Sequence, residues 1–350
     1  MSQEPPTKKR KVVDADAPKA VEAASKLTEE LPSLPFAYQY RNGKFFYVRK
    51  CYEGYYEVVK KMLDDGRPCV TVTGTPGIGK SVFYAYFFNR LREREPNTWI
   101  IAISFKRENI AEIAVYKGCD DPEEIDTYVT SESEVAVGKV LKEARAHKKK
   151  VLFLCDGRPT KLWGSSKMVV CTSPNEKWLR AVRKDDSTLF MPLWTFEELR
   201  EAALALSLAG SSGVKGITDD DLETRYNTFG GVARECLHPD KEFVERAKNY
   251  IIAEIKKISS LDELRSVLKG VQDGVDWHCI FYYFPVDAKG INRGWKLASP
   301  FVVERLAKRM LEVTRNDKEA IRASIENIPG GAPLVEWLDA HQGLGGAQSS

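Results

Sequence analysis

The sequence has no long apolar run, no paired cysteines and no strong excess of charge. Its apolar runs stay well short of the eighteen or so residues that a membrane-spanning helix needs, so we expect no membrane partner. The seven cysteines contain no C-x-x-C pair, and several lie in apolar runs such as VLFLCD, which is typical of free thiols in a reducing compartment. The four histidines are isolated, so no structural metal site is predicted.

The net charge of +3 comes from one cluster near the N-terminus. Lys8, Lys9, Arg10 and Lys11 supply four of the 53 basic residues, and the other 49 face 50 acidic ones. The rest of the chain is therefore close to neutral, and only a local surface could attract nucleic acid. One helix flank is a candidate for such a surface, with a solvated helix end as the simpler interpretation; its cations are Lys139, Lys142, Arg145, Lys148, Lys149 and Lys150.

The basic cluster has a specific form. Within PTKKRKV it is very similar to the nuclear-import signal of a viral large T antigen, which predicts an import receptor as partner and the nucleus as location. A solvated basic tail without a receptor is the alternative. No apolar segment follows the cluster, so we expect no secretory signal peptide, and we predict a disordered tail over residues 1–35.

Apolar periodicity predicts an α/β core over residues 36–195. A helix near residues 52–63 leads into the core, and strands at 69–73, 99–105, 150–156, 168–173 and 188–194 alternate with helices at 81–95 and 132–148. Further structure is expected near 109–118. Such alternation indicates a mostly parallel sheet that is covered on both faces.

Beyond Thr195 the pattern becomes chiefly helical. We predict a helical lid subdomain over residues 196–275, a small C-terminal α+β region over 276–340 and a loose tail over 341–350. The C-terminal region contains an aromatic strand, CIFYYFPV, and a helix with Ser299 as its N-cap and Pro300 in its first turn.

The stretch VTGTPGIGKS contains the pattern G-x-x-x-x-G-K-[ST] between a predicted strand and a predicted helix. Glycines let the backbone turn N–H groups toward a phosphate, and the helix adds the positive end of its dipole. Lys80 is expected at the β- and γ-phosphates, and the Ser81 hydroxyl on Mg²⁺. A glycine turn without nucleotide is the alternative; the predicted nucleotide-binding residues are Gly74, Thr75, Pro76, Gly77, Ile78, Gly79, Lys80, Ser81 and Val82.

A second carboxylate is needed near the metal. The buried run VLFLC ends in Asp156 about seventy residues after the loop, which is the Walker B form and predicts a second Mg²⁺ ligand. The residues that follow are GRPTK, without an adjacent glutamate to orient water. The hydrolytic base is left open, with Glu108 or a residue of a partner chain as options.

Three further residues are candidates for sensing the γ-phosphate. Ser173 and Asn175 follow the strand MVVCTS at the level where additional-strand ATPases place a sensor, with helix capping as an equal alternative. Arg234 follows the glycine turn FGGVAR and could reach the phosphates from the lid, or could be a plain surface arginine.

These motifs together resemble a known family. TGTPGIGKSVFYAYFFNRL, VLFLCDG, MVVCTSPNEKW, FMPLWTFEELREA, FGGVARECL and ASPFVVERL look like the NTPase module of Crinkler (crinkling-and-necrosis) effectors and retrotransposon hot spot proteins, over residues 40–340. The resemblance implies an additional-strand, AAA/STAND-like P-loop fold. It also implies Lys80 and Ser81 at the phosphates and metal, Asp156 on Mg²⁺, Arg234 in the lid, and action in the nucleus. Because the chain lacks an effector-type header and stops near LVEWLDAHQ, we expect neither secretion into a host nor an appended nuclease domain.

The sequence thus predicts a nuclear, ATP-preferring NTPase with Mg²⁺ and ATP as cofactors. Its output would be a conformational change that acts on DNA or on nuclear host proteins, and assembly into a homo-oligomer stays open. A small GTPase is disfavoured because the N-K-x-D and D-x-x-G patterns are missing. A nuclease is disfavoured because Glu254-Ile255-Lys256 lies in a helical pattern. The serious alternative is a non-hydrolysing module in which bound ATP acts as a conformational switch.

Overall fold

The computed structural model describes most of the chain. The described residues are 27–37, 44–118, 125–129, 133–160, 162–163, 166–182, 187–208, 216–269 and 277–341. The import-like cluster Lys8–Lys11 and most of the predicted C-terminal tail lie outside these residues. Within them, no helix has the length and apolar character that crossing a membrane requires.

A seven-stranded sheet forms the centre of the fold, in the order β6-β5-β4-β7-β8-β3-β9. Five neighbouring strands, from β4 to β9, run parallel, and β5 and β6 add an antiparallel edge. The strand β8 thus lies between β3, which precedes the glycine loop, and β7, which ends at Asp156. The strand bounds are β3 Cys69–Thr73, β4 Thr98–Lys106, β5 Asn109–Tyr116, β6 Ile125–Val129, β7 Lys150–Asp156, β8 Lys167–Cys171 and β9 Thr188–Phe190.

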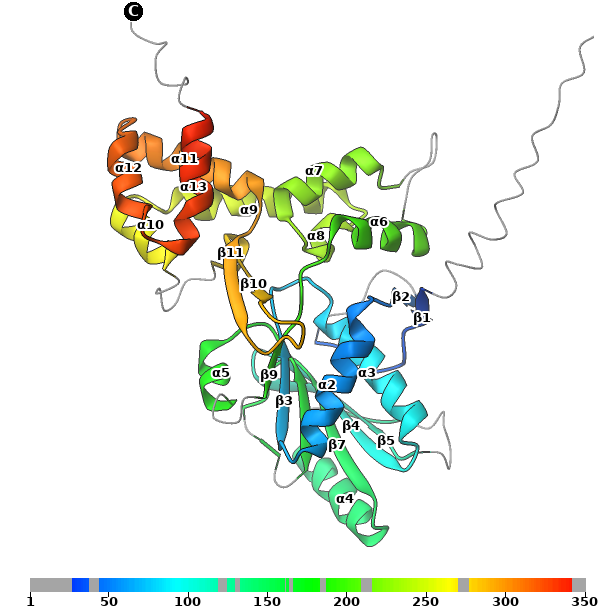
Figure 1. Cartoon of the computed structure of the whole chain (residues 1–350). Coiled ribbons are helices and arrows are strands. Elements are labelled where there is room, and N and C mark those ends of the chain that lie inside the picture. The colour runs from blue at the N-terminus through cyan, green and yellow to red at the C-terminus, as the bar shows by residue number, and fades with distance from the viewer. Residues whose placement is uncertain are drawn as a thin grey trace, which may run out of the picture.

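Helices cover both faces of the sheet, which confirms the predicted α/β layering (Figure 1). The helices α2 (Cys51–Asp64) and α3 (Lys80–Arg94) pack on one face, and α4 (Ser133–Ala146) and α5 (Glu176–Val182) pack on the other. Successive residues of β4 alternate between the two cores, and both sides are buried, which explains the unbroken apolar run over residues 99–103.

The N-terminal segment corrects the predicted boundary of the disordered tail. Residues Thr28–Glu30 form β1, which pairs antiparallel with β2 (Phe45–Tyr47). Glu29 forms an ion pair with Arg90 of α3, and the hydroxyl of Tyr84 donates to the carbonyl of Pro35 at 3.0 Å. Contacts with residues distant in the sequence order this segment, and its polar local composition gives no sign of them.

The chain after Thr195 is chiefly helical, as predicted. The helices are α6 Phe196–Ala205, α7 Asp219–Phe229, α8 Ala233–Cys236, α9 Lys241–Lys256 and α10 Leu261–Leu268. Capping boxes begin α6 at Thr195 and α7 at Thr218, where each threonine and the acid three residues later exchange hydrogen bonds.

The C-terminal residues share one core with these helices. The short helix η2 (Trp277–Cys279) precedes a hairpin of β10 and β11, whose second strand was not predicted. The hairpin lies between the sheet and the helices α6–α13 (Figure 1). Leu306 of α11 belongs to the same buried cluster as Ile251 of α9. The remaining bounds are β10 Phe281–Pro285, β11 Arg293–Leu297, α11 Pro300–Val313, α12 Lys318–Ile325, η3 Pro329–Gly331 and α13 Ala332–Ala340.

A buried arginine ties the start of α2 to the segment between β9 and α6. The Arg49 guanidinium donates to the carbonyls of Pro192 at 2.8 Å and Leu193 at 3.0 Å, and it forms an ion pair with Glu198 at 2.8 Å. It also lies over the Trp194 ring, 4.6 Å from the ring centroid. Its charge and hydrogen-bond donors are therefore satisfied without water.

Substituting Arg49 with methionine should strongly destabilise the fold. The change leaves the Glu198 carboxylate and two carbonyls without their buried partner, a loss of about 3–5 kcal/mol in the free energy of unfolding. Lys50→Met is the matched control, because the Lys50 side chain is 70% exposed and its ion pair with Glu201 is worth less than about 1 kcal/mol. Urea unfolding of both variants measures the difference, and equal losses would contradict the role given to Arg49.

Candidate nucleotide site

The glycine loop connects β3 to α3 at the carboxyl edge of the parallel strands. Gly79 has a φ of 97° and is the N-cap of α3, while Gly77 has a φ of 84°. A Cβ on Gly77 would lie 2.7 Å from Cγ1 of Val232, so the loop and the lid leave no room for a side chain. The loop thus adopts left-handed turns that only glycine readily allows, and it ends at a helix N-terminus.

Lys80 lies at the centre of this loop. Its side chain is almost fully buried, and its Nζ donates to the carbonyls of Gly74 and Thr75, both at 2.8 Å. Burial, aided by the positive charge of Arg234, lowers the pKa of Lys80 to about 7. A phosphate placed in the loop would favour the charged ammonium, so anion binding and the charge of Lys80 support each other.

Ser81 and Asp156 meet next to the loop. The Ser81 hydroxyl donates to Oδ1 of Asp156 at 2.7 Å, and the Asp156 side chain lies buried at the end of β7. Burial raises the pKa of Asp156, and hydrogen bonds from Ala37 and Ser81 oppose that rise. A hydroxyl and a carboxylate in contact are hard oxygen donors, which suit Mg²⁺.

The donor set fits a nucleotide-bound magnesium better than an all-protein metal cage. Within the described part of the chain, no group of three or more His, Cys, Asp or Glu side chains could hold a metal. Mg²⁺ commonly takes only one or two protein ligands and completes its octahedron with phosphate oxygens and water. Ser81 and Asp156 can supply such a pair.

A backbone contact to Asp156 was not foreseen from the sequence. The N–H of Ala37 donates to Oδ2 of Asp156 at 2.9 Å, across 119 residues of sequence. The ring of Phe36 packs edge-on against Tyr84 of α3 and holds this segment beside the carboxylate. A backbone donor can come from any residue type, so no sequence pattern could have shown this contact.

The two predicted sensor residues lie beyond the end of β8. Ser173 is exposed, and Oδ1 of Asn175 accepts from the Trp178 N–H at 3.0 Å, which is a helix-capping bond at the start of α5. The same amide oxygen accepts from Arg158, which also forms an ion pair with Glu108. Capping therefore accounts for Asn175, and Glu108, the suggested base, has a cationic partner.

Arg234 lies against the glycine loop. Its N–H donates to the carbonyl of Gly77 at 3.1 Å, while its guanidinium donates to Oε1 of the neighbouring Glu235 at 2.8 and 2.5 Å. The second oxygen, Oε2 of Glu235, is buried without a partner among the described residues and would lie 3.1 Å from a Cβ on Gly77. Sequence reasoning missed Glu235, because a single acid after an arginine forms no pattern.

Burial also affects this carboxylate. It raises the pKa of Glu235, and the adjacent Arg234 counteracts the rise. Arg234 and Glu235 are thus a charge pair at the contact between loop and lid, and the Arg234 side chain is still 56% exposed. The exposed arginine can reach another partner, but its departure would leave the buried Glu235 carboxylate without its cation.

Comparisons with known proteins add little. No family model matches the sequence, and no curated protein matches it. A solved structure of AMPPCP-bound DnaA from Aquifex aeolicus is similar over 84% of this chain and 94% of that chain, with 13% sequence identity and a TM-score of 0.30. At so low a TM-score, this likeness supports no statement about function.

The buried Lys80 should make stability depend on pH in a defined direction. The folded protein loses the Lys80 proton near pH 7, whereas an unfolded lysine keeps it until about 10.5. Between these values the unfolded state binds more protons, so stability should rise with pH relative to Lys80→Met. Urea unfolding at pH 7, 8 and 9 measures this difference. The exposed variant Lys256→Met should follow wild type, and a constant difference between wild type and Lys80→Met would contradict a buried, neutralisable Lys80.

Proposed function

We propose that the chain is an additional-strand P-loop NTPase that binds ATP with Mg²⁺ and hydrolyses it. The observation that carries the proposal is the joint placement of Lys80, Ser81 and Asp156 around one glycine loop. The position of β8 between the loop strand and the Asp156 strand supports the additional-strand class. ATP is preferred over GTP because the sequence lacks the N-K-x-D pattern that reads guanine.

Each residue has a role that follows from its position. The loop backbone and the N-terminus of α3 bind the phosphates, and the Lys80 ammonium orients the β- and γ-phosphates. Ser81 and Asp156 hold Mg²⁺, which when bound neutralises charge that develops on the transferring phosphoryl group. Arg234 leaves Glu235 for the phosphates and thereby reports their presence to the lid.

A carboxylate for orienting water is available on β5, two strands away from β7 in the sheet. In the sheet register Asp156 of β7 lies beside Ser104 of β4, and Ser104 lies opposite Glu112 of β5. Directly paired residues share a face, so Glu112 and Asp156 point to the α3 side, two strand spacings or roughly 10 Å apart. Burial raises the pKa of Tyr84 of α3, and the charges of Asp156 and, more weakly, Glu112 add to that rise. We assign Glu112 to water orientation.

The biological setting follows from the sequence resemblance. A Crinkler-like module with an import-like cluster at Lys8–Lys11 would enter the nucleus through an import receptor. There it would act on DNA or on nuclear proteins, which would be those of a host if the protein is delivered into one. A non-hydrolysing, nucleotide-gated module is the second candidate. It is favoured by the absence of a glutamate directly after Asp156 and by the ion pair that occupies Glu108.

The central test uses Lys80→Ala and Asp156→Ala. Fluorescent ATP binding should weaken by roughly 100-fold in Lys80→Ala, because a buried cation facing the phosphates is lost. Mg²⁺-dependent phosphate release should disappear in both variants, while Lys256→Ala, an exposed control, keeps both properties. Unchanged affinity in Lys80→Ala would refute the nucleotide site, and tight binding without release by the wild type would favour the gated module.

Glu112→Gln separates chemistry from binding. The variant should bind ATP like wild type but release phosphate at least about 100-fold more slowly, because general base catalysis contributes that much. Glu108→Gln is the matched control on the adjacent turn and should retain most of the turnover. If Glu108→Gln is the slower variant, the assignment of Glu112 is wrong.

A further inference from the structure

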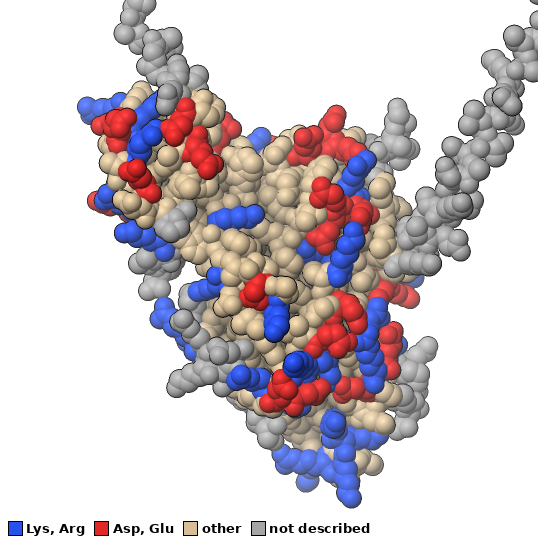
Figure 2. All heavy atoms as spheres, in the orientation of Figure 1, with Lys and Arg blue, Asp and Glu red and all other residues tan. Residues whose placement is uncertain are grey.

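Six cations form a basic surface at the end of the sheet opposite the glycine loop. Strand β7 shows the separation, since Lys150 begins it and Asp156 ends it, roughly 20 Å away. Figure 2 shows Lys and Arg gathered at the lower end of the molecule, where Figure 1 places α4. We call this the basic surface; its residues are Lys139, Lys142, Arg145, Lys148, Lys149 and Lys150.

The cations of the basic surface have no anionic partners within the described part of the chain. The nearby acids are engaged elsewhere, because Glu143 pairs with Lys117 and Glu95 pairs with Lys60. Lys149 makes one polar contact, to the amide oxygen of Asn97 at 3.5 Å, and the other five cations are exposed. The surface therefore holds a net positive charge that the described residues do not neutralise.

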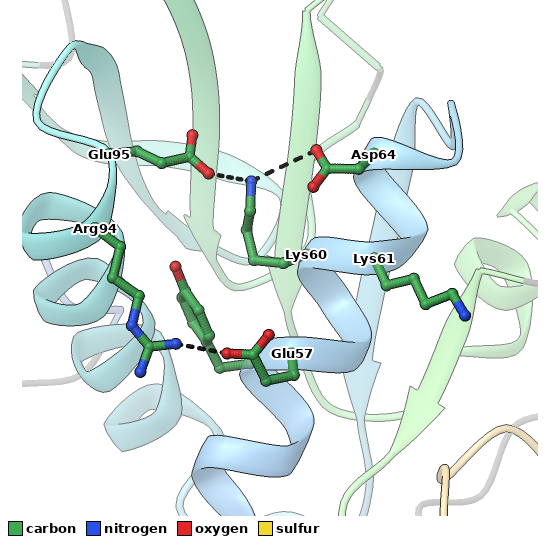
Figure 3. A pocket seen from close by; sticks show the side chains of 7 residues that line it. Glu57, Lys60, Lys61, Asp64, Arg94 and Glu95 are labelled. Atoms are coloured by element: carbon green, nitrogen blue, oxygen red, sulfur yellow. Dashed lines mark hydrogen bonds and ion pairs between the residues drawn. The ribbon is translucent and has the colours of Figure 1, made fainter.

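In a hollow near the basic surface, by contrast, most of the cations are paired with acids. It has a volume of about 420 Å³ and is lined by residues of both signs. Figure 3 shows Lys60 between Glu95 and Asp64, and Arg94 directed at Glu57. The basic surface borders a second hollow, of about 510 Å³, which Lys148, Lys149 and Lys150 line beside Asn97 and Thr98. In the first hollow Lys60 and Arg94 are paired with acids and Lys61 is not, whereas Lys148, Lys149 and Lys150 of the second hollow all lack an anionic partner among the described residues.

Stabilisation of the helix end does not explain all six cations. Interaction with the helix dipole falls off within the last turn, and α4 ends at Ala146. Lys139 and Lys142 lie before that turn. Together with Arg145 they follow one another at intervals of three residues, on one flank of the helix. The chain then reverses through Lys148, whose φ is 53°, so that the following lysines extend the same surface.

The composition favours a phosphate backbone over an acidic protein. Protein interfaces have apolar or aromatic centres that are poor in lysine, whereas five of these six cations are lysines and the second hollow has Pro96 as its one apolar lining residue. Single-stranded nucleic acid is usually held by exposed aromatic rings, and the nearby Trp99 is buried. Binding to a duplex backbone requires neither an apolar centre nor exposed aromatic rings.

We propose that the basic surface binds the phosphate backbone of a nucleic-acid duplex without reading its sequence. The contact is electrostatic, so its affinity falls as salt rises. It lies at the opposite end of β7 from Asp156 and does not require nucleotide. The proposal names a partner for the proposed function but does not rest on the nucleotide site, so a protein that fails to bind ATP would still bind the duplex.

The test compares two triple charge reversals in the full chain. One carries Lys142→Glu, Arg145→Glu and Lys148→Glu in the basic surface. The matched control carries Lys256→Glu, Lys269→Glu and Lys289→Glu, three exposed lysines elsewhere with the same change in net charge. Both are made with Lys8–Lys11 changed to alanine, so that the N-terminal cluster cannot mask the result. Fluorescence anisotropy with a labelled 20-base-pair duplex, without nucleotide, measures affinity at several salt concentrations.

The basic-surface variant should bind at least about tenfold more weakly than the control at 100 mM salt. The slope of log affinity against log salt should become shallower by about 2.7, which corresponds to three lost phosphate contacts. Parallel measurements with DNA and RNA duplexes distinguish the source of the backbone, and binding to either supports the proposal. Equal affinity and slope in the two variants would overturn it, as would binding of a polyglutamate peptide in preference to both duplexes. Lys80→Ala should bind the duplex like wild type.

Discussion

Trp194 joins the glycine loop to the segment that precedes α6 and to the turn at Gly231. Nε1 of Trp194 donates to the carbonyl of Ile78 at 2.8 Å, while its backbone N–H donates to the carbonyl of Gly231 at 3.0 Å. Arg49 covers its ring, and the Tyr52 hydroxyl holds the next loop carbonyl, that of Gly79, at 3.0 Å. A loop rich in glycine would otherwise lose much entropy on ordering, so these buried bonds preorganise it.

The same contacts make the lid sensitive to the loop. A Cβ on Gly231 would lie 2.2 Å from the carbonyl oxygen of Trp194, and one on Gly230 would lie 2.5 Å from that of Ala298. The turn at Gly230 and Gly231, called the lid turn below, is thus closely packed between Trp194 and the C-terminal hairpin. Tyr282 of that hairpin donates to the carbonyl of Phe229, and the N–H of Tyr283 donates to Thr75 in the loop. A change in the loop cannot be absorbed locally, because its neighbours are already in close contact.

Local patterns made part of this structure predictable. The loop at Gly74–Ser81, the apolar run before Asp156 and the alternation of strands and helices are all short-range signals, and β3, β4, β7 and β8 with helices α2, α3 and α4 formed close to where they were expected. The predicted strand 188–194 ends at Phe190, and β1, β2, β6 and β11 were not predicted. Contacts over long sequence separations were not predictable. Predicting them requires the tertiary arrangement, including strand order and register, which no single segment encodes. Examples are the contacts of Ala37 with Asp156 and of Thr75 with Tyr283, and the row of paired residues from Asp156 to Glu112. The N-terminal segment shows the same limit, since it is ordered by contacts with distant residues such as Arg90 and Tyr84.

The charged side chains at the two ends of β7 differ in whether they have partners within the protein. This difference determines which parts of the molecule a bound nucleotide could affect. At the loop end Lys80, Asp156 and Glu235 are buried and bonded within the protein, so phosphate and metal must exchange with existing partners. At the other end the cations of the basic surface have no anionic partners to exchange among the described residues. Coupling between two sites needs a structural element that can adopt two arrangements. Strand β7 is paired on both sides and so has only a single arrangement. The Arg234–Glu235 contact and the lid turn can rearrange, so the effect of nucleotide should pass to the lid and the hairpin rather than along the sheet to the basic surface.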